Sequence, residues 1–436
     1  MIRPGDVSRL GLQPDPGAAR RLSSALALTI PLIVSPVFAQ DTLRYAIPPP
    51  AIGLQPGAQL GYSVAVDGPY TVVGAPHDDL SGRNSGTVKV FNSTTGAFLF
   101  PLLDPGPATD NSFGYSVAIS GTRVIVGGPG DDSDGDSTGR AFVYDLVVGT
   151  PSIPVAVLQN PTPRGSDRFG SSVAISGERI VVGAFLDDTG ATDSGSAYVY
   201  DLGASAPLVP VATLSNPDPA SRDWFGRSVS ISGTRVLVGA VGDSASASGP
   251  GSAYLYDLLS RTPTVPVAAL SNPNPGEFKD FGDAVAVSGM LAVVGTDWGA
   301  GAVLVYDLAS GTPAAVVTVL ANPDPNPNAR TGFGSSVTIS GTRVVVGAHR
   351  EFYGVPEVGS VYVYDLSSAA PTVFVAKLNN PSPASNDRFG FSVAISGTRV
   401  MVGAPADDAD ATDSGSAYGY DLLGATPAAP TATLHD

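Results

Sequence analysis

The sequence predicts an all-β fold, namely a seven-bladed β-propeller of four-stranded antiparallel blades. A phrase like "FGSSVAISGERIVVGA" begins at residues 113, 169, 225, 281, 333 and 389, and a divergent copy, "LGYSVAV", begins at residue 60. The copies are spaced 52 to 56 residues apart, which is typical of repeat architectures. The chain also holds 52 Gly and 39 Pro without a helical period of apolar residues, which favours strands and turns.

Each unit contains four short stretches rich in Val, Ile and Tyr. In the third unit we expect strands A, B, C and D at residues 172–176, 179–184, 196–202 and 210–217. Strands A and B are separated only by Gly177 and Glu178, which is typical of a tight hairpin. Successive apolar positions indicate sheets that are covered on both faces, so each blade is expected to pack against its neighbours.

An antiparallel A–B–C–D meander predicts two rims with different connections. The A–B turns and C–D connections share one rim, and the B–C loops and D–A connections share the other. The seven B–C segments hold 15 Asp and 2 Glu against two Arg. Several A–B turns instead carry an arginine: Arg123, Arg179, Arg235, Arg343 and Arg399. We therefore expect an acidic B–C/D–A rim, and loops on one face of a rigid scaffold commonly carry binding residues.

The ends of the chain predict its processing and the closure of the ring. Residues 1–39 are typical of an export signal, with an Arg-containing start, an apolar run and "VFA" as a cleavage site. We expect residues 40–59 to form a leader and residues 60–436 to form the propeller. Two closures stay open: a leader strand at 42–47 joins the last blade, or that blade comes entirely from the C-terminus. We favour the leader strand because it would cover an open sheet edge.

Charge and cysteine content limit the partners. The net charge is −16, and without residues 1–39 the chain keeps 19 basic and 37 acidic residues, a net charge of −18. Such a chain is not expected to bind nucleic acid through its phosphates. It contains no Cys, so its stability cannot depend on disulfides. We expect a monomer without a membrane span after signal removal, located outside the cell, on its surface or in the periplasm.

The Asp-rich B–C loops are the candidate metal sites. Ca²⁺ takes six to eight oxygen ligands, mainly carboxylates and carbonyls on flexible loops that contain Gly. The candidate ligands in the second, third and seventh units are Asp131, Asp132, Asp134, Asp136, Asp187, Asp188, Asp193, Asp407, Asp408, Asp410 and Asp413. The alternating Asp residues of 132–136 resemble the start of an EF-hand loop, but a Glu at the twelfth position is missing. The alternative is that these residues stabilise turns and keep the rim soluble.

Other recurring residues have mainly structural interpretations. The Asp residues before the FG pairs, Asp167, Asp223, Asp280 and Asp387, are expected to hydrogen-bond their own turns. The FG pairs themselves are expected to pack between blades. Trp298, Phe352 and Tyr353 could form an aromatic patch for a sugar or peptide, or a local plug at the end of the axis. We expect no catalytic residue, since "GDSTG" (135–139) lies in an acidic loop rather than in a strand–turn–helix elbow.

The phrases "FGYSVAISGTRVIVGGP" (113–129) and "FGFSVAISGTRVMVGAP" (389–405) resemble FG-GAP repeats. Such repeats form the propeller of integrin α-subunits and of many exported bacterial proteins. The resemblance covers residues 60–436 and implies a seven-bladed propeller at or outside the cell surface, often linked to adhesion or ligand binding. Integrin-type repeats place a calcium loop between the FG and GAP strands. Here that connection is a turn such as "SGTR", so the resemblance does not carry that site over.

Together these features predict a non-enzymatic binding or adhesion protein. Its partner would be a protein or glycan on the acidic rim, and Ca²⁺ is the candidate cofactor. Two alternatives stay open: a carbohydrate-active enzyme, either glycosidase or lyase, that uses loop carboxylates, and a structural module of an envelope or matrix. The enzyme predicts two carboxylates with shifted pKa values in one deep pocket near the axis. The binding protein predicts a shallow acidic surface.

Overall fold

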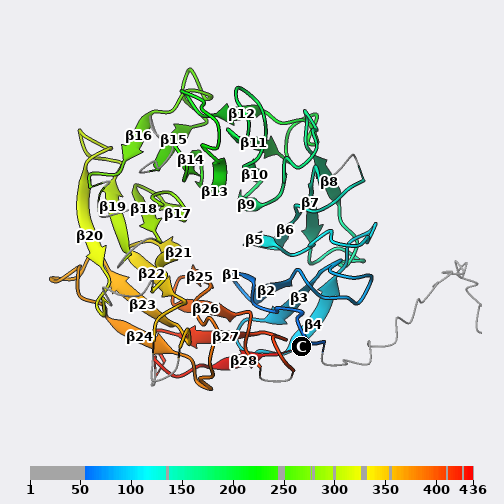
Figure 1. Ribbon diagram of the computed structural model, residues 1–436, viewed down its shortest axis with the longest axis vertical. Helices are drawn as coiled ribbons and strands as arrows, with labels where there is room; N and C mark the ends of the chain where they lie inside the picture. Colours follow the sequence, from blue (N-terminus) through cyan, green and yellow to red (C-terminus); the bar gives the residue numbers. More distant parts are fainter. Residues whose placement is uncertain are drawn as a thin grey trace, which may run out of the picture. The chain divides into compact units, whose positions relative to one another are not determined.

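The protein is a ring of seven four-stranded antiparallel sheets around a central axis, as predicted (Figure 1). This computed structural model describes residues 55–133, 137–243, 251–274, 276, 280–297, 301–325, 331–352, 356–408, 411–424 and 427–435. The chain divides into residues 1–51 and 52–436, and the second unit contains every strand described below.

Two strands of each blade lie nearest the axis. Strand A is β1 (Ser63–Asp67), β5 (Ser116–Ser120), β9 (Ser172–Ser176), β13 (Phe225–Ser232), β17 (Val285–Ser288), β21 (Phe333–Ser340) and β25 (Ser392–Ser396). Strand B is β2 (Tyr70–Ala75), β6 (Arg123–Gly128), β10 (Arg179–Ala184), β14 (Arg235–Ala240), β18 (Leu291–Thr296), β22 (Arg343–Ala348) and β26 (Arg399–Ala404).

The other two strands complete each sheet towards its outer edge. Strand C is β3 (Thr87–Asn92), β7 (Arg140–Asp145), β11 (Ser196–Asp201), β15 (Ser252–Asp257), β19 (Ala302–Asp307), β23 (Ser360–Asp365) and β27 (Ser416–Asp421). Strand D is β4 (Phe98–Leu102), β8 (Ala156–Gln159), β12 (Ala212–Ser215), β16 (Ala268–Ser271), β20 (Val316–Ala321), β24 (Ala376–Asn379) and β28 (Ala432–Leu434).

Burial follows the position of a strand in its blade. In the third blade β10 is buried after its first residue and β11 is buried up to Asp201, because neighbouring blades cover both faces. Strand A, nearest the axis, is mostly half-buried, as in β5 and β9. The predicted bounds of strands A and B in this blade are correct, and strand D is shorter than predicted, at Ala212–Ser215.

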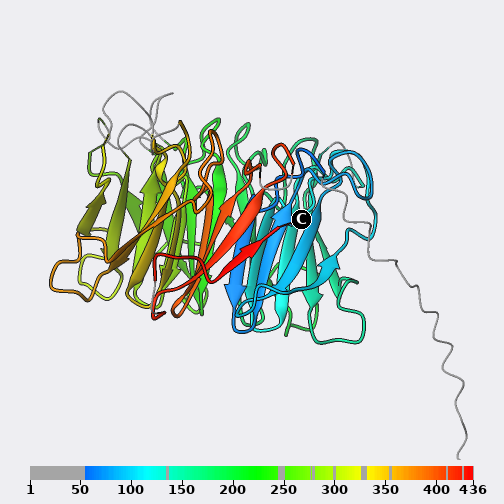
Figure 2. The same cartoon turned by 90° about the horizontal axis from the view of Figure 1, so that it is seen from below.

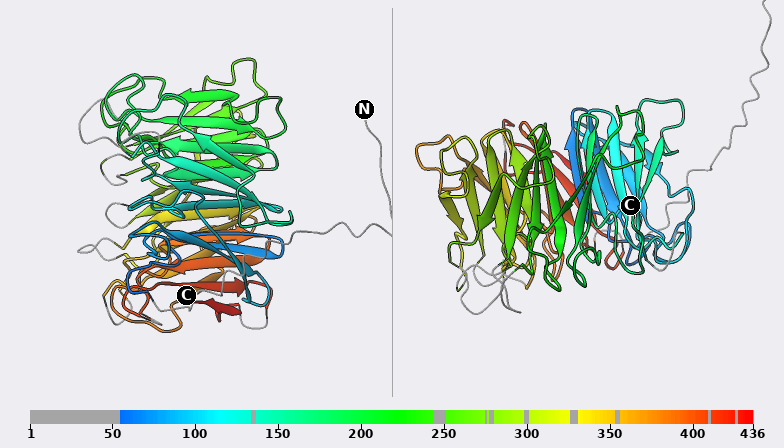
Figure 3. Two further views of the ribbon diagram at one scale, coloured as in Figure 1. Left: turned by 90° about the vertical axis from the view of Figure 1, so that its right-hand side faces the viewer. Right: turned by 90° about the horizontal axis from the view of Figure 1, so that it is seen from above.

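The strand connections lie at two opposite edges of the ring (Figure 2; Figure 3). Each sheet pairs its strands in the order A–B–C–D, antiparallel throughout. The B–C loops and D–A connections also bond to each other; for example, the Arg222 amide donates to the Thr192 carbonyl across 2.9 Å. The two predicted rims are therefore present. In the described residues, no helix is both long and apolar enough to span a membrane.

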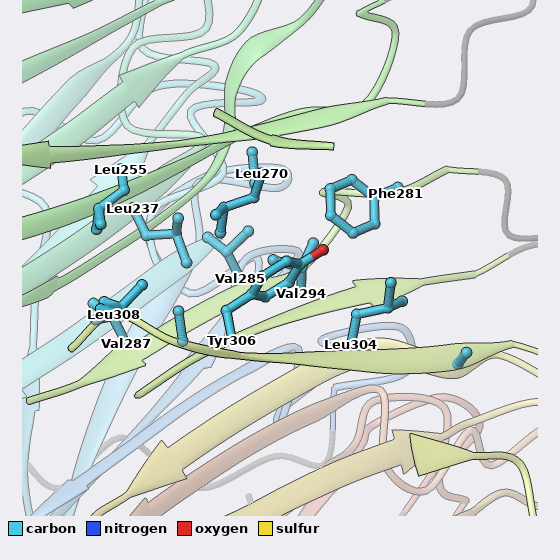
Figure 4. Close-up of a cluster of buried hydrophobic side chains, with 13 residues drawn as sticks. Leu237, Leu255, Leu270, Phe281, Val285, Val287, Val294, Leu304, Tyr306 and Leu308 are labelled. Atoms are coloured by element: carbon cyan, nitrogen blue, oxygen red, sulfur yellow. The ribbon is translucent and has the colours of Figure 1, made fainter. Parts of the chain in front are cut away.

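Apolar clusters between neighbouring blades form the core. Figure 4 shows the cluster between the fourth and fifth blades, where Phe281 lies among Leu270 of β16, Val285 of β17 and Tyr306 of β19. The Phe residue of every FG pair has a side chain that is fully buried: Phe113, Phe169, Phe225, Phe281, Phe333 and Phe389. Because one blade cannot bury its own faces, the repeated phrase encodes the interfaces as well as the strands.

Two serines of the repeated strand A also connect neighbouring blades. The Ser172 hydroxyl donates to the Gly226 carbonyl of the next blade across 2.8 Å. At the other end of strand A, the Ser176 hydroxyl accepts from the Gly233 amide at 3.0 Å. The first bond recurs at the junctions Ser63–Gly114, Ser116–Gly170, Ser228–Gly282, Ser336–Gly390 and Ser392–Gly61. These bonds explain why both serines of "SVAIS" recur.

The last blade takes all four described strands, β25 to β28, from C-terminal residues. Residues before the first blade then bond to it: the Leu60 amide donates to the Ser414 carbonyl at 2.9 Å, and Gln59 bonds Asp413 in the same way at 3.2 Å. The ring thus closes by the same contacts that join its other blades. The expected leader strand at 42–47 lies outside the described residues and stays a prediction.

Candidate functional site

The first acid of the B–C loop is buried in five of the seven blades, at Asp78, Asp131, Asp187, Glu351 and Asp407. Asp187 is 1% exposed. Its Oδ1 accepts from the backbone amide and hydroxyl of Thr189 at 2.8 and 2.6 Å, and its Oδ2 accepts from the Tyr198 hydroxyl on β11. This carboxylate therefore forms the turn after strand B and holds it against strand C.

Other blades repeat this arrangement with different donors. Asp407 accepts from the Tyr418 hydroxyl, and Glu351 accepts from the Tyr362 hydroxyl at 2.7 Å. Asp131 lies 3.7 Å from Nε of Arg140, which is the first residue of strand C in the second blade. Three candidate metal ligands, Asp131, Asp187 and Asp407, thus have buried carboxylates that bind groups of the protein itself.

The second and third Asp residues of the B–C loop hydrogen-bond each other and shape the turn at the end of the loop. Asp188 Oδ1 accepts from the Asp193 amide at 2.9 Å, and Asp408 accepts from Asp413 at 2.8 Å. Asp193 has a φ of 55°, in the left-handed region that Asp and Asn tolerate, and its carbonyl accepts from the Trp224 amide of the next blade. Asp132 binds the amide of Ser137 in the same way at 2.7 Å. Asp132 and Asp408 remain exposed to solvent.

Three calcium candidates, Asp134, Asp136 and Asp410, lie outside the described residues. Among the residues that are described, no group of three or more His, Cys, Asp or Glu side chains is arranged to hold a metal ion. The loops of the second and seventh blades each need an undescribed Asp to complete their set. Calcium binding there therefore stays a prediction.

The prediction that the Asp residue before the FG pair hydrogen-bonds its own turn is confirmed in three of the four blades for which it was made. Asp167 Oδ2 accepts from Asn160 Nδ2 at 2.7 Å and from the Arg164 amide at 2.6 Å, and the same bonds recur at Asp223 and Asp387. Burial raises the pKa of Asp167 to about 6, and that of Asp387 likewise to about 6. Asp280 differs because it directly precedes Phe281 and has a φ of 56°.

The residues that follow the FG pairs meet near the axis on the same rim. The ring centroid of Tyr62 lies 5.0 Å from that of Tyr115 and 4.9 Å from that of Phe391, which joins the first, second and seventh blades. Arg227 Nε lies 3.4 Å from Asp283 Oδ1, and this ion pair joins the fourth and fifth blades. Arg227 also lies close enough to Tyr115 for the tyrosine to raise the pKa of its guanidinium. Contact between blades that are not neighbours requires side chains to reach across the axis, and we name these five residues the axial cluster.

Solvent reaches the axial cluster only in part. The Arg227 side chain is 36% exposed and that of Asp283 is 21% exposed. Burial raises the pKa of Asp283, and the Arg227 guanidinium opposes this effect. Burial lowers the pKa of Arg227, but the Asp283 carboxylate and Tyr115 outweigh it, so the pKa of Arg227 is raised. The cluster thus presents a charged hydrogen-bonding pair beside aromatic rings, which is a common composition of small-ligand and protein contact sites.

His349 supports the edge of this cluster. Its Nδ1 lies 2.8 Å from the Ser335 hydroxyl, and its ring packs edge-on against Phe391 with centroids 5.4 Å apart. Burial, together with Arg350 and Arg388, lowers the pKa of His349 to about 3. The imidazole is therefore neutral at physiological pH.

The axial cluster was not expected from the sequence, although a signal for it is present there. In "FGxS" the positions around x are nearly constant, whereas x itself is Tyr62, Tyr115, Ser171, Arg227, Asp283, Ser335 and Phe391 in the seven blades. A variable position inside a constant phrase is the expected signature of a binding position on a repeated scaffold. Of the aromatic patch expected from sequence, Phe352 is 60% exposed, whereas Trp298 and Tyr353 lie outside the described residues.

The B–C/D–A rim is acidic but contains paired arginines as well. Arg83 lies 2.7 Å from Asp110, Arg350 lies 3.5 Å from Asp297, and Arg388 lies 3.9 Å from Glu357. Arg83 and Arg350 lie in B–C loops and Arg388 lies in a D–A connection, so the rim is less uniformly acidic than the Asp residues of the B–C loops alone suggest. Ion pairs at the solvent-exposed surface contribute little to stability.

A family profile matches most of the repeated units. The profile described as "FG-GAP repeat" matches residues 53–91, 102–144, 161–200, 209–256, 323–364 and 372–420. No curated protein matches the chain. Among solved structures, the computationally designed Ika8 protein aligns with a TM-score of 0.48 and 16% identity over 84% of this chain and 85% of its own. Since the FG-GAP profile covers more than half of the sequence, the chain belongs to the FG-GAP repeat family.

Proposed function

We propose that this protein is a secreted or surface-associated binding propeller without catalytic activity, and that it contacts a protein or glycan through the B–C/D–A rim. The observation that carries the proposal is the axial cluster. It places Tyr62, Tyr115 and Arg227, residue types that dominate binding energy in interfaces, near the middle of one rim. They occupy the x position of the FGxS phrase, which varies more from blade to blade than the positions on either side of it.

The loops around the cluster supply the charge that would select the partner. Exposed carboxylates such as Asp132 and Asp408 surround a centre in which Arg227 is already paired with Asp283. A negative surface attracts cationic partners and repels anionic ones. We therefore expect neutral glycans or basic protein segments rather than acidic polysaccharides. Calcium on the B–C loops would weaken this preference by neutralising carboxylates.

A binding screen followed by matched variants tests the proposal. The full chain is screened against an array of neutral and acidic oligosaccharides and against a displayed peptide library, and hits are measured by calorimetry. Arg227→Ala and Tyr115→Ala should each weaken binding at least tenfold, because both residues lie in the proposed contact. Arg235→Ala, on the opposite rim, is the control and should leave affinity unchanged.

Two results would refute this proposal. One is the absence of any hit in both screens with protein that is folded by circular dichroism. The other is a hit whose affinity depends on Arg235 and not on Arg227 or Tyr115. Turnover of an oligosaccharide by the wild-type chain would instead support the carbohydrate-active enzyme.

A further inference from the structure

Exposed apolar side chains are distributed very unequally between the two rims. Twenty large apolar side chains are exposed in the described residues, and only Leu80 and Phe352 lie on the B–C/D–A rim. The other eighteen lie in the A–B turns, in the C–D connections or at the start of strand D. A soluble monomer normally exposes such residues singly, and larger groups mark interaction sites.

Some of these side chains recur at equivalent positions in several blades, so the repeating backbone places them on the same rim. Just before strand D, one residue of the C–D connection is 54–60% exposed and the residue two positions later is 51–57% exposed. In the third, fourth and sixth blades these residues are Val209 and Val211, Val265 and Val267, and Val373 and Val375. We name these six residues the aliphatic belt.

Charge indicates what can cover the aliphatic belt. The A–B/C–D rim is nearly balanced, since the Arg residues of the A–B turns lie beside the Asp residues that end strand C. For example, Arg179 Nε lies 3.7 Å from Asp201 Oδ2. The acid surplus of the chain lies on the other rim. Two copies that meet through their balanced rims would keep their acidic rims on opposite outer sides, where repulsion is weakest.

A lipid surface fits this rim less well. Apolar faces that bind membranes are typically rich in Lys and Arg beside Trp. The described part of the A–B/C–D rim contains neither Lys nor Trp. A chain with a net charge of −16 is also repelled by anionic lipids.

We propose that the aliphatic belt packs against the same surface of a second copy of this chain, so that the protein forms a rim-to-rim dimer. Eighteen exposed apolar side chains lie on this rim, the six of the belt among them, so a rim-to-rim contact need not bury all of them to reach the roughly 800 Å² that each partner buries in a standard interface. This proposal differs from the monomer expected from the sequence. It leaves both B–C/D–A rims free, so the proposed function and this interface can fail independently.

Sedimentation equilibrium of the full chain tests this interface. We expect a monomer–dimer equilibrium in the micromolar range that persists at high salt. The double variant Val209→Lys/Val265→Lys should raise the dimer dissociation constant at least tenfold, because it places charges opposite each other in the belt. Leu80→Lys, the same kind of change at an exposed aliphatic residue on the other rim, should alter it less than twofold.

Thermal melts of each variant exclude unfolding as the cause of any change. A wild-type chain that stays monomeric at concentrations up to about 100 μM would overturn the proposal. So would a dimer that Leu80→Lys disrupts and the belt variant does not. Flotation of the monomer with phosphatidylcholine vesicles, lost in the belt variant, would overturn it in favour of a lipid surface.

Discussion

The hydroxyl of Ser392 donates a hydrogen bond to the carbonyl of Gly61 across 2.8 Å, although 331 residues separate the two in sequence. This bond joins the last blade to the first. It is the same bond that Ser172 makes to Gly226 between neighbouring blades in the chain. The ring is therefore closed by a repeated contact rather than by a special one, and this contact leads to the first prediction.

Ala284→Ser should stabilise the protein. Ala284 occupies the position in the fifth blade at which the other blades have the serine that bonds the next FG glycine. A serine there can donate to the Gly334 carbonyl, and one added hydrogen bond contributes about 0.5–1.5 kcal/mol. Urea denaturation measures the change. Ser228→Ala is the matched reverse variant and should lose about 1–3 kcal/mol. Destabilisation by Ala284→Ser would contradict a shared role for this position.

The two acids of one B–C loop should differ sharply in their effect on stability. Asp187→Ala leaves the Tyr198 hydroxyl and the Thr189 amide without their buried acceptor, and should cost about 2–4 kcal/mol. Asp188→Ala loses only the bond from the Asp193 amide at a half-buried site, and should cost less than about 1 kcal/mol. Denaturation midpoints of the two variants check this difference. Equal losses would mean that the first acid is not the anchor of the loop.

Stability should also depend on pH through Asp167 and Asp387. Each has a folded-state pKa of about 6, above the unfolded value of about 3.9. The folded state therefore binds these protons more tightly, so their contribution to stability is present below about pH 4 and is lost as pH rises through about 6.

The variant Asp167→Asn isolates this effect. It keeps an acceptor for Asn160 and for the Arg164 amide but cannot ionise. Its stability relative to wild type should rise between pH 4 and pH 7, by at most about 3 kcal/mol. Denaturation at several pH values measures the difference. A difference that does not change with pH would show that Asp167 stays ionised in the folded protein over that range.

Calcium should raise the melting temperature if the loops of the second and seventh blades bind it. A ligand that binds only the folded state stabilises it by mass action. The measurement is a thermal melt in EDTA and in increasing calcium. Asp132→Ala and Asp408→Ala change exposed carboxylates, so they should reduce the calcium response while keeping the melt in EDTA. No shift up to millimolar calcium would exclude these sites.

The sequence by itself determined the seven repeats, the antiparallel blades and the bounds of β9 and β10. This was possible because strand period, turn residues and repeat spacing are local properties of the chain. It also identified Asp167 as a turn residue and the FG phenylalanines as interface residues. Both roles follow from nearby sequence and from the need of each blade to bury its faces.

Only the tertiary structure decided the roles of Asp187, Asp407 and the axial cluster. Whether a loop carboxylate binds a metal or a neighbouring strand depends on its burial. The Tyr198 hydroxyl that binds the Asp187 carboxylate belongs to a residue eleven positions later in the sequence. Arg227 and Tyr115 meet because closing the ring brings the second and fourth blades to one axis. No local pattern specifies a contact between side chains 112 positions apart in sequence, since it arises only when every blade is in place.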